Sequence, residues 1–247
     1  MKNLLTFGCS FTASSGEYLI SVKGETPIKY REPPKSWPVE LARLTDSNPV
    51  CRGKGGVGNF YITNRIYDTV DDSDNSVVIV MWRGIDRIDM AVSKREFHYF
   101  DKFNDNIRDS WLHSGGMRLF DNSKTKDRYW HNYYRTYHTE EDLYTQTLQH
   151  IIGAQEFLSN RKIPYLFLTY KDIFTGRERI YKRAKNLENQ INWNKFHFPN
   201  GKFGGEFEWV KDNNLTWAED KSHPSPKSHR KFAEYLYNLD ECRYLFK

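Results

Sequence analysis

The sequence predicts an α/β fold with three layers, in which helices cover both faces of a mostly parallel, flavodoxin-like sheet. Short apolar runs alternate along the chain with segments whose apolar residues recur at helical spacing. The clearest run, Val77–Trp82 (VVIVMW), is apolar and mostly β-branched throughout, as is typical of a parallel strand buried on both faces. Since parallel strands need crossover connections, usually helices, the alternation itself favours a parallel sheet.

Four strands and four helices are expected, in strict alternation. The strands are expected at Leu4–Phe7, Pro49–Cys51, Val77–Trp82 and Pro164–Thr169. The helices are expected at Trp37–Leu44, Phe60–Tyr67, Leu143–Asn160 and Lys227–Asn238. Pro34 and Ser36 suit the start of the first helix, and a glycine-dense loop precedes the second.

A single domain, residues 1–247, suits this chain length. Two stretches depart from the alternation. Residues 93–139 are rich in aromatics, His and Arg without a clean period, and residues 171–217 are polar with scattered Trp and Phe. We interpret both as aromatic-rich insertions over one edge of the sheet. Aromatics make up 16% of the chain, and surface Trp and Tyr often mark recognition of sugars or proteins.

Composition argues against several partners. The net charge of +5 comes from 37 basic and 32 acidic residues that are mixed along the chain. The basic, aromatic stretch Lys124–Arg135 includes the acidic Asp127 and matches no nucleic-acid fold motif, so a nucleic-acid partner is disfavoured. No run approaches the roughly 20 apolar residues of a membrane span. The opening residues 1–5 are too short for a signal peptide, which favours a cytoplasmic location.

No metal or cofactor is expected. Three cysteines lack metal-ligand spacing, and their odd number and wide separation suit a reducing compartment (Cys9, Cys51 and Cys242). Five histidines lie in or near the first insertion without a carboxylate in register (His98, His113, His131, His138 and His150).

Ser10 is a candidate nucleophile, because it follows a buried strand and Gly8. Ligands bind at the carboxyl ends of strands in α/β sheets, and a hydroxyl at a helix start gains from nearby N–H groups. Taken alone, Ser10 is better explained as a turn residue or as the N-cap of a helix. Cys9 is interpreted as a small buried thiol, which is commoner than a nucleophile.

Asp220 and His223 form the second candidate pair. A carboxylate three residues before an imidazole can contact it, fix its tautomer and stabilise its protonated form. The alternative is a capping segment in which Asp220 or Ser225 caps the last helix, whose start Pro224 and Pro226 suit.

The loop 53–59 (GKGGVGN) is the third candidate. A glycine such as Gly56 lets a ligand approach the backbone, where a free N–H could hold an oxyanion; a tight turn is the alternative. The loop lacks the Lys-Ser/Thr ending of a nucleotide-binding P-loop, so a nucleotide site is disfavoured.

In their order along the chain, these motifs resemble the SGNH (GDSL-like) hydrolase family. Residues 8–12 (GCSFT) look like its serine block, Gly56 lies where its oxyanion glycine would be, and residues 220–225 (DKSHPS) look like its Asp-x-x-His block. Residues 36–38 (SWP) and the turn from Gly56 to Asn59 are similar to a branch seen in phage and bacterial genomes. That branch adds a virion-associated location to the expectation. The resemblance covers residues 3–92, about 140–170 and 217–240.

The resemblance implies a serine hydrolase that acts on an ester without a cofactor. Ser10 would be the nucleophile, His223 the base and Asp220 its charge partner, with the N–H groups of Ser10 and Gly56 as oxyanion donors. A small-molecule or glycan ester is the expected substrate, with a carbohydrate O-acyl ester such as an acetyl ester preferred.

Two departures from the family pattern matter. Cys9 replaces the usual Asp of the first block, and Ile85 lies near the position of the oxyanion-hole Asn of the third block. Losing one oxyanion donor costs on the order of 10²–10³ in rate. Either Asn59, Arg83 or Arg87 substitutes for it, or the protein is a weak or inactive SGNH-fold module that binds a glycan or a protein partner.

Overall fold

A four-stranded parallel sheet lies at the centre of the computed structural model, which describes residues 1–13, 36–71, 75–92, 107–108, 111–113, 136–177 and 181–247. The strands are β1 (Asn3–Gly8), β2 (Asn48–Cys51), β3 (Ser76–Trp82) and β7 (Tyr165–Thr169). Their order in space is β2-β1-β3-β7, and every neighbouring pair is parallel. This is the start of the flavodoxin-like order, so the predicted fold class is confirmed.

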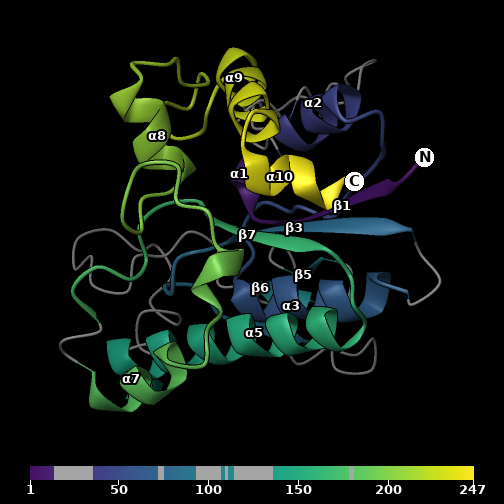
Figure 1. The fold of residues 1–247 in the computed structure, drawn as a ribbon. Helices are drawn as coiled ribbons and strands as arrows, with labels where there is room; N and C mark the ends of the chain where they lie inside the picture. The colour runs from purple at the N-terminus through teal and green to yellow at the C-terminus, as the bar shows by residue number, and fades with distance from the viewer. Residues whose placement is uncertain (14–35, 72–74, 93–106, 109–110, 114–135, 178–180) are drawn as a thin grey trace.

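Helices cover both faces of the sheet (Figure 1). One face carries α2 (Trp37–Leu44), α9 (Pro226–Tyr237) and α10 (Asp240–Leu245), and the other carries α3 (Asn59–Thr69) and α5 (Glu140–Asn160). On the outer side of α5 lies α7 (Lys182–Glu188). The three expected layers are therefore present, and α10 is an addition that the sequence did not predict.

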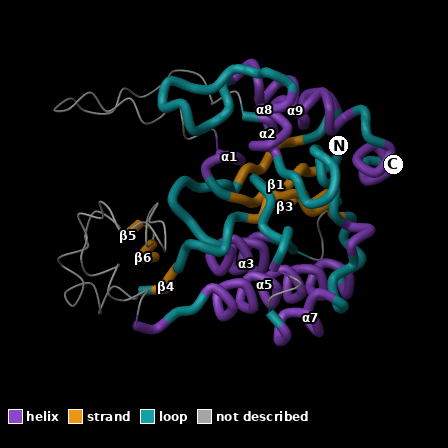
Figure 2. The backbone as a smooth tube through the Cα atoms, turned by 90° about the vertical axis from the view of Figure 1, so that its left-hand side faces the viewer, coloured by secondary structure: helices purple, strands orange, loops and turns teal. Residues whose placement is uncertain are grey.

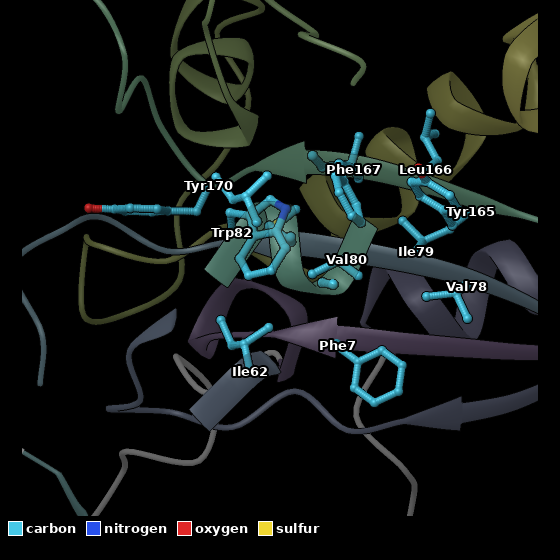
Figure 3. Packing of buried hydrophobic residues seen from close by; sticks show 14 of the residues in the cluster. Phe7, Ile62, Val78, Ile79, Val80, Trp82, Tyr165, Leu166, Phe167 and Tyr170 are labelled. Atoms are coloured by element: carbon cyan, nitrogen blue, oxygen red, sulfur yellow. The ribbon is translucent and has the colours of Figure 1, made fainter. Parts of the chain in front are cut away.

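Strand β3 is the middle of the core. All seven of its residues are buried, which the uninterrupted apolar run predicted. Figure 3 shows Val78, Val80 and Trp82 along this strand, with Phe7 of β1 on one side and Phe167 of β7 on the other. The rings of Trp82 and Phe167 meet edge to face at 5.4 Å between centroids.

Helix starts follow the local signals in the sequence. The start of α9 has Ser225 as its N-cap, whose hydroxyl accepts the Ser228 N–H at 3.3 Å, and Pro226 in its first turn. Helix α5 begins before the expected Leu143, because the Thr139 hydroxyl accepts the Asp142 N–H at 3.1 Å and three acidic residues fill the first turn.

A small antiparallel sheet, not predicted from the sequence, lies beside α3 (Figure 2). It consists of β4 (Asp89–Ala91), β6 (Trp111–His113) and β5 (Ile107–Arg108), in the order β4-β6-β5. The other residues of the stretch 93–135, Lys124–Arg135 included, lie outside the described residues.

The stretch 171–217 contributes to the core. It contains α7, the 3₁₀ helix η3 (Trp193–Lys195) and α8 (Glu206–Asp212). Phe196 forms a parallel bridge with Phe167, so this segment extends the sheet at the β7 edge. Five aromatic rings of the stretch pack on one another instead of facing solvent singly (Phe174, Trp193, Phe196, Phe198 and Phe203).

Within the described residues, we find no helix with both the length and the apolar character needed to cross a membrane.

Two neighbouring isoleucines of α5 test the assignment of its buried face. Ile151 is 0% exposed in the core, whereas Ile152 is only partly buried. We expect Ile151→Ala to lower the free energy of unfolding by about 2–5 kcal/mol, since it leaves a cavity, and Ile152→Ala to lower it clearly less. Denaturant unfolding measures both, and equal losses would contradict the assigned face.

Candidate active site

Three strands end at one edge of the sheet and bring distant residues together. Gly8 of β1 is paired with Met81 of β3, so Ser10 and Arg83 each lie two residues beyond that pair. Strand β7 ends beside β3, and Tyr170 follows it. The edge thus gathers a hydroxyl, a guanidinium and a phenol from three parts of the chain.

Ser10 begins the short helix α1 (Ser10–Ala13) in a tight turn. The N–H groups of Thr12 and Ala13 both donate to the Cys9 carbonyl, at 3.0 and 3.1 Å. A side chain on Gly8 would collide with Thr12, so this turn needs a glycine. As the first residue of α1, Ser10 has an N–H with no acceptor inside the helix. Ser10 is 7% exposed, so it lies at the surface of the turn without being open to bulk solvent.

The structure brings Ser10, His223 and Asp220 together. The Ser10 hydroxyl lies 2.8 Å from Nε2 of His223, across 213 positions of sequence. The other ring nitrogen, Nδ1, is hydrogen-bonded to Oδ2 of Asp220. The second carboxylate oxygen accepts the N–H groups of Ser222 and His223, at 2.9 and 3.0 Å. The Phe11 ring packs 5.3 Å from the imidazole and limits its movement.

A hairpin-like loop holds the Asp220 and His223 side chains in place. Trp217 and Pro224 form an antiparallel bridge, and the Ala218 N–H donates to the His223 carbonyl at 2.8 Å. Lys221 at the tip has φ +56°, in the left-handed region. Because Ser225 caps α9, the carboxylate of Asp220 remains available to His223.

Hydrogen bonds keep the Asp220 carboxylate ionised. Burial alone would raise its pKa, but the N–H of Ser222 and the ring and N–H of His223 together lower the pKa below its ordinary value. An ionised acceptor on Nδ1 favours the tautomer whose Nε2 faces Ser10 as a base.

Gly56 lies beside this edge with φ +87°, which favours glycine. Among the described residues its N–H donates to no acceptor. The loop is fixed to the serine turn, because the Lys54 N–H donates to the Gly8 carbonyl at 3.1 Å.

Asn59 does not serve the role expected of its side chain. Its Nδ2 donates to the Arg83 carbonyl at 2.9 Å and to the Thr147 hydroxyl at 3.2 Å, and its Oδ1 accepts the Arg83 N–H at 2.8 Å. Both amide hydrogens are therefore engaged, which leaves none for a bound oxyanion. The prediction of Asn59 as a substitute donor is wrong; the residue instead fixes the backbone from which the Arg83 side chain extends.

Both candidate arginines lie at the edge. The Arg83 guanidinium stacks on Tyr170, 3.9 Å from its ring centroid, and Tyr170 in turn packs 5.3 Å from Phe11. Nη1 of Arg87 lies 3.8 Å from the place that a Cβ on Gly56 would occupy. Ile85, near the position of the family's asparagine, is buried and carries no donor.

The two guanidiniums differ in electrostatic environment. Burial opposes the charge of Arg83, but Cys9, Tyr170 and Asp86 outweigh it and raise its pKa. For Arg87, burial and then repulsion by Arg83 lower the pKa. The charge of Arg87 is thus the less compensated of the two.

Asp89 and Tyr170 are residues of this region that the sequence analysis missed. The buried Asp89 carboxylate accepts the N–H groups of Gly58 and Tyr61, at 2.9 Å each, and contacts Nδ1 of His113 at 2.8 Å. It thereby holds the start of α3 in place. No spacing rule links Asp89 to α3, whereas Tyr170 could have been found as the residue that follows the last strand.

The described histidines and cysteines outside the site form no metal centre. His138 contacts Asp142 at 3.1 Å, His113 contacts Asp89, and His150 packs against Phe60. In the part of the chain that the structure describes, no three His, Cys, Asp or Glu side chains are grouped to hold a metal ion. His98 and His131 lie outside the described residues. The three cysteines are free thiols, and Cys9 is 0% exposed.

Several solved structures are similar to this one in fold. One similar structure is that of a carbohydrate esterase whose active site is described as having divergent catalytic and non-catalytic binding functions. It matches over 98% of this chain and 70% of its own, with 12% identity and a TM-score of 0.50. The chain shares its fold with this esterase. A protein of the G-D-S-L family from Desulfitobacterium hafniense DCB-2 matches over 96% and 98% of the two chains, with 12% identity and a TM-score of 0.42. The acetyl xylan esterase AlAXEase matches over 95% and 98%, with 13% identity and a TM-score of 0.44.

No protein-family model and no curated protein sequence matches the chain.

The bridge from Asn59 to the backbone of Arg83 can be tested through stability. Asn59→Ala removes the partners of the part-buried Arg83 N–H and carbonyl, and we expect a total loss of about 1–3 kcal/mol. Asn64→Ala, on the same helix, removes only an exposed bond to the Phe60 carbonyl and is expected to change stability by about 0.5 kcal/mol or less. Unfolding in denaturant separates the two, and a loss no larger for Asn59→Ala than for the control would contradict the bridge.

Proposed function

We propose that this chain is a serine hydrolase of the SGNH type that cleaves an ester bond. The observation that carries the proposal is the 2.8 Å contact between the Ser10 hydroxyl and Nε2 of His223, with Asp220 on the opposite ring nitrogen. Two segments at opposite ends of the chain supply these groups, and no fold requirement calls for a serine, a histidine and an aspartate to meet there.

The reaction would proceed through a covalent acyl-enzyme. His223 takes the hydroxyl proton as Ser10 attacks the ester carbonyl, and the protonated imidazole then gives that proton to the leaving alcohol. Asp220 stabilises the imidazolium. Water next attacks the acyl-serine, with His223 again as base, and releases the acid and the free serine.

Backbone N–H groups of Ser10 and Gly56 are the proposed oxyanion donors, since both lie at the carboxyl edge and neither is used by secondary structure. A third donor, which an asparagine would supply in the family, has to come from a guanidinium. Arg83 is the better placed, because its raised pKa and its stacking on Tyr170 keep a charged group fixed near Ser10.

The preferred substrate is a carbohydrate O-acyl ester, such as an acetyl ester. Its support is the shared fold with a carbohydrate esterase and the exposed aromatic ring of Phe60, which lines a cavity together with Arg87. A second candidate is a binding module with weak or lost catalysis. The observation in its favour is the loss of the third donor, because Ile85 replaces it and the Asn59 amide is engaged elsewhere.

Replacing the proposed nucleophile should abolish turnover. We expect Ser10→Ala to lower kcat on 4-nitrophenyl acetate by at least about 10³-fold, because no acyl-enzyme can form. The matched control is Cys9→Ala, one residue earlier, which should retain most of the activity. Steady-state kinetics of the two purified variants decide, and equal activity of Ser10→Ala and the parent protein would refute the assignment.

Neutralising the charge partner should reduce the rate without preventing binding. Asp220→Asn is expected to lower kcat on the order of 10⁴-fold with little change in KM, because the amide favours the wrong imidazole tautomer. Glu219→Gln removes one carboxylate from the preceding, exposed position and should leave kcat within about twofold. Equal effects of both variants on kcat would show that only the overall charge of the loop matters.

The lowered pKa of Asp220 also predicts a direction with pH. Because its pKa is lower in the folded than in the unfolded chain, its contribution to stability is present above the unfolded pKa and is lost as pH falls through the folded value. The stability difference between the parent and Asp220→Asn, from denaturant unfolding at a series of pH values, should therefore shrink on acidification. A difference that grows towards low pH would contradict this linkage.

A further inference from the structure

A cavity of about 320 Å³ lies beside the Gly56 loop, on the α3 and α5 side of the sheet. Its walls are the start of α3, the loop after β3 and the middle of α5. The polar residues among them are Asn59, Arg87, Asp89, Gln146, Thr147 and His150. Ile85 and Leu143 supply apolar wall. The cavity is large enough for a small polar substituent of a substrate.

Apart from Arg87, the two ionisable groups described in the lining, Asp89 and His150, need no further partner. Asp89 already accepts three donors, namely the N–H groups of Gly58 and Tyr61 and the ring of His113. Burial lowers the pKa of His150, which keeps this imidazole neutral. Among the ionisable groups described in the lining, Arg87 is therefore the one with unused donors, and the Asp89 carboxylate formally balances its charge.

The Arg87 guanidinium has unused hydrogen-bond donors. Its Nε and Nη1 atoms are buried and have no hydrogen-bond partner among the described residues. A buried guanidinium without partners is costly, and the oxygens of a carboxylate or a phosphate would supply acceptors for these donors.

The charged groups near Arg87 are of both signs. The groups that affect the pKa of Arg87 include one cation, Arg83, and one carboxylate, Asp86. Lys171 lies near the same carboxylate and near Tyr170. Glu208 also acts on Lys171, and Asp89 lines the same cavity, so an anion would be held by the unused donors of Arg87 and not by an excess of positive charge.

The cavity is connected to the proposed reaction centre through Arg87 itself. Its Nη1 lies 3.8 Å from the Cβ position of Gly56, whose N–H is a proposed oxyanion donor. Cys9, the residue before Ser10, is close enough to raise the pKa of Arg87. The lining of the cavity thus reaches the Gly56 loop through Arg87, while Ser10 and His223 lie outside that lining.

We infer that the cavity selects esters that carry an oxyanionic group, a carboxylate or a phosphate, which the Arg87 guanidinium binds. Thr147 and Gln146 add neutral hydrogen-bonding groups, and Ile85 and Leu143 contact the carbon chain. This inference rests on the proposed function and makes it narrower: the substrate is an acidic ester, for example one on an acidic sugar, and not a neutral one. Arg87 is assigned to substrate selection, while Arg83 remains the proposed oxyanion donor.

Binding to a protein that cannot turn over the ester tests this inference directly. In the Ser10→Ala background, monomethyl succinate, methyl phosphate and the neutral dimethyl succinate are titrated by calorimetry. We expect at least one anion to bind, and the neutral diester to bind at least about tenfold more weakly. Whether the carboxylate or the phosphate binds more tightly identifies which oxyanion the site prefers.

Variants at Arg87 then assign the effect. Arg87→Gln should weaken anion binding at least about tenfold, and Arg87→Lys, which keeps the charge without the fork, should fall between the two. Arg183→Gln, on the exposed surface of α7, is the matched control and should bind like its parent. Unfolding midpoints verify that each variant is folded. If Arg87→Gln does not fold, the comparison of Arg87→Lys with its parent decides.

Two outcomes overturn the inference: the neutral diester binds as tightly as both anions, or the Arg87 variants bind anions as the parent does. Either result leaves ester hydrolysis by the wild-type chain untouched. Conversely, the chain could bind anions through Arg87 and yet hydrolyse no ester. That result would contradict the proposed function but support the anion site.

Discussion

The parallel pairing of β1 and β3 determines where every proposed site residue lies. The two strands run side by side over the whole of β1, from Asn3 beside Ser76 to Gly8 beside Met81. Because β3 is buried along its full length, a shift of register would move apolar residues out of the core. This constraint fixes the turn that carries Ser10 relative to the loop that carries Arg83. The Asn59 amide, which bonds both backbone groups of Arg83, secures the same loop from the side of α3.

The last loop adds the groups that the sheet cannot supply. Asp220 and His223 extend from a turn that is closed by its own backbone bonds and is anchored on α9 through Ser225. Their position depends on α9 packing against α2, where the rings of Phe232 and Trp37 meet edge to face. The proposed nucleophile and its base thus depend on two separate parts of the core, and damage to either should separate them.

The sequence predicted what short-range patterns encode. An apolar, β-branched run indicated β3. Ser10 was indicated by its place after a glycine at a strand end, and Asp220 and His223 by an Asp-x-x-His segment far along the chain. Their meeting was not encoded locally; it was expected because the order of the motifs resembles that of the SGNH hydrolase family. The three-layer fold and its flavodoxin-like strand order were predicted because alternating strands and helices leave few topologies.

The sequence did not predict contacts between elements where no periodic residue pattern signals the contact. The sequence suggested Asn59 as an oxyanion donor, because a polar residue after glycines looks available until its partner Arg83, in the loop after β3, is known. The bonds of Asp89 to the start of α3, and the small sheet that begins with it, have no signal in spacing. Arg83 and Arg87 looked equivalent four residues apart, whereas the structure places one on Tyr170 and the other beside Gly56 and a cavity.

The central claim is that Ser10, activated by His223, is a nucleophile. Its most direct test is to treat the wild-type chain with a fluorophosphonate, digest it and locate the adduct by mass spectrometry. We predict one adduct on the Ser10 hydroxyl, absent from a His223→Ala variant that retains the wild-type unfolding midpoint. An unlabelled wild-type chain, or an adduct on another residue, would contradict the claim.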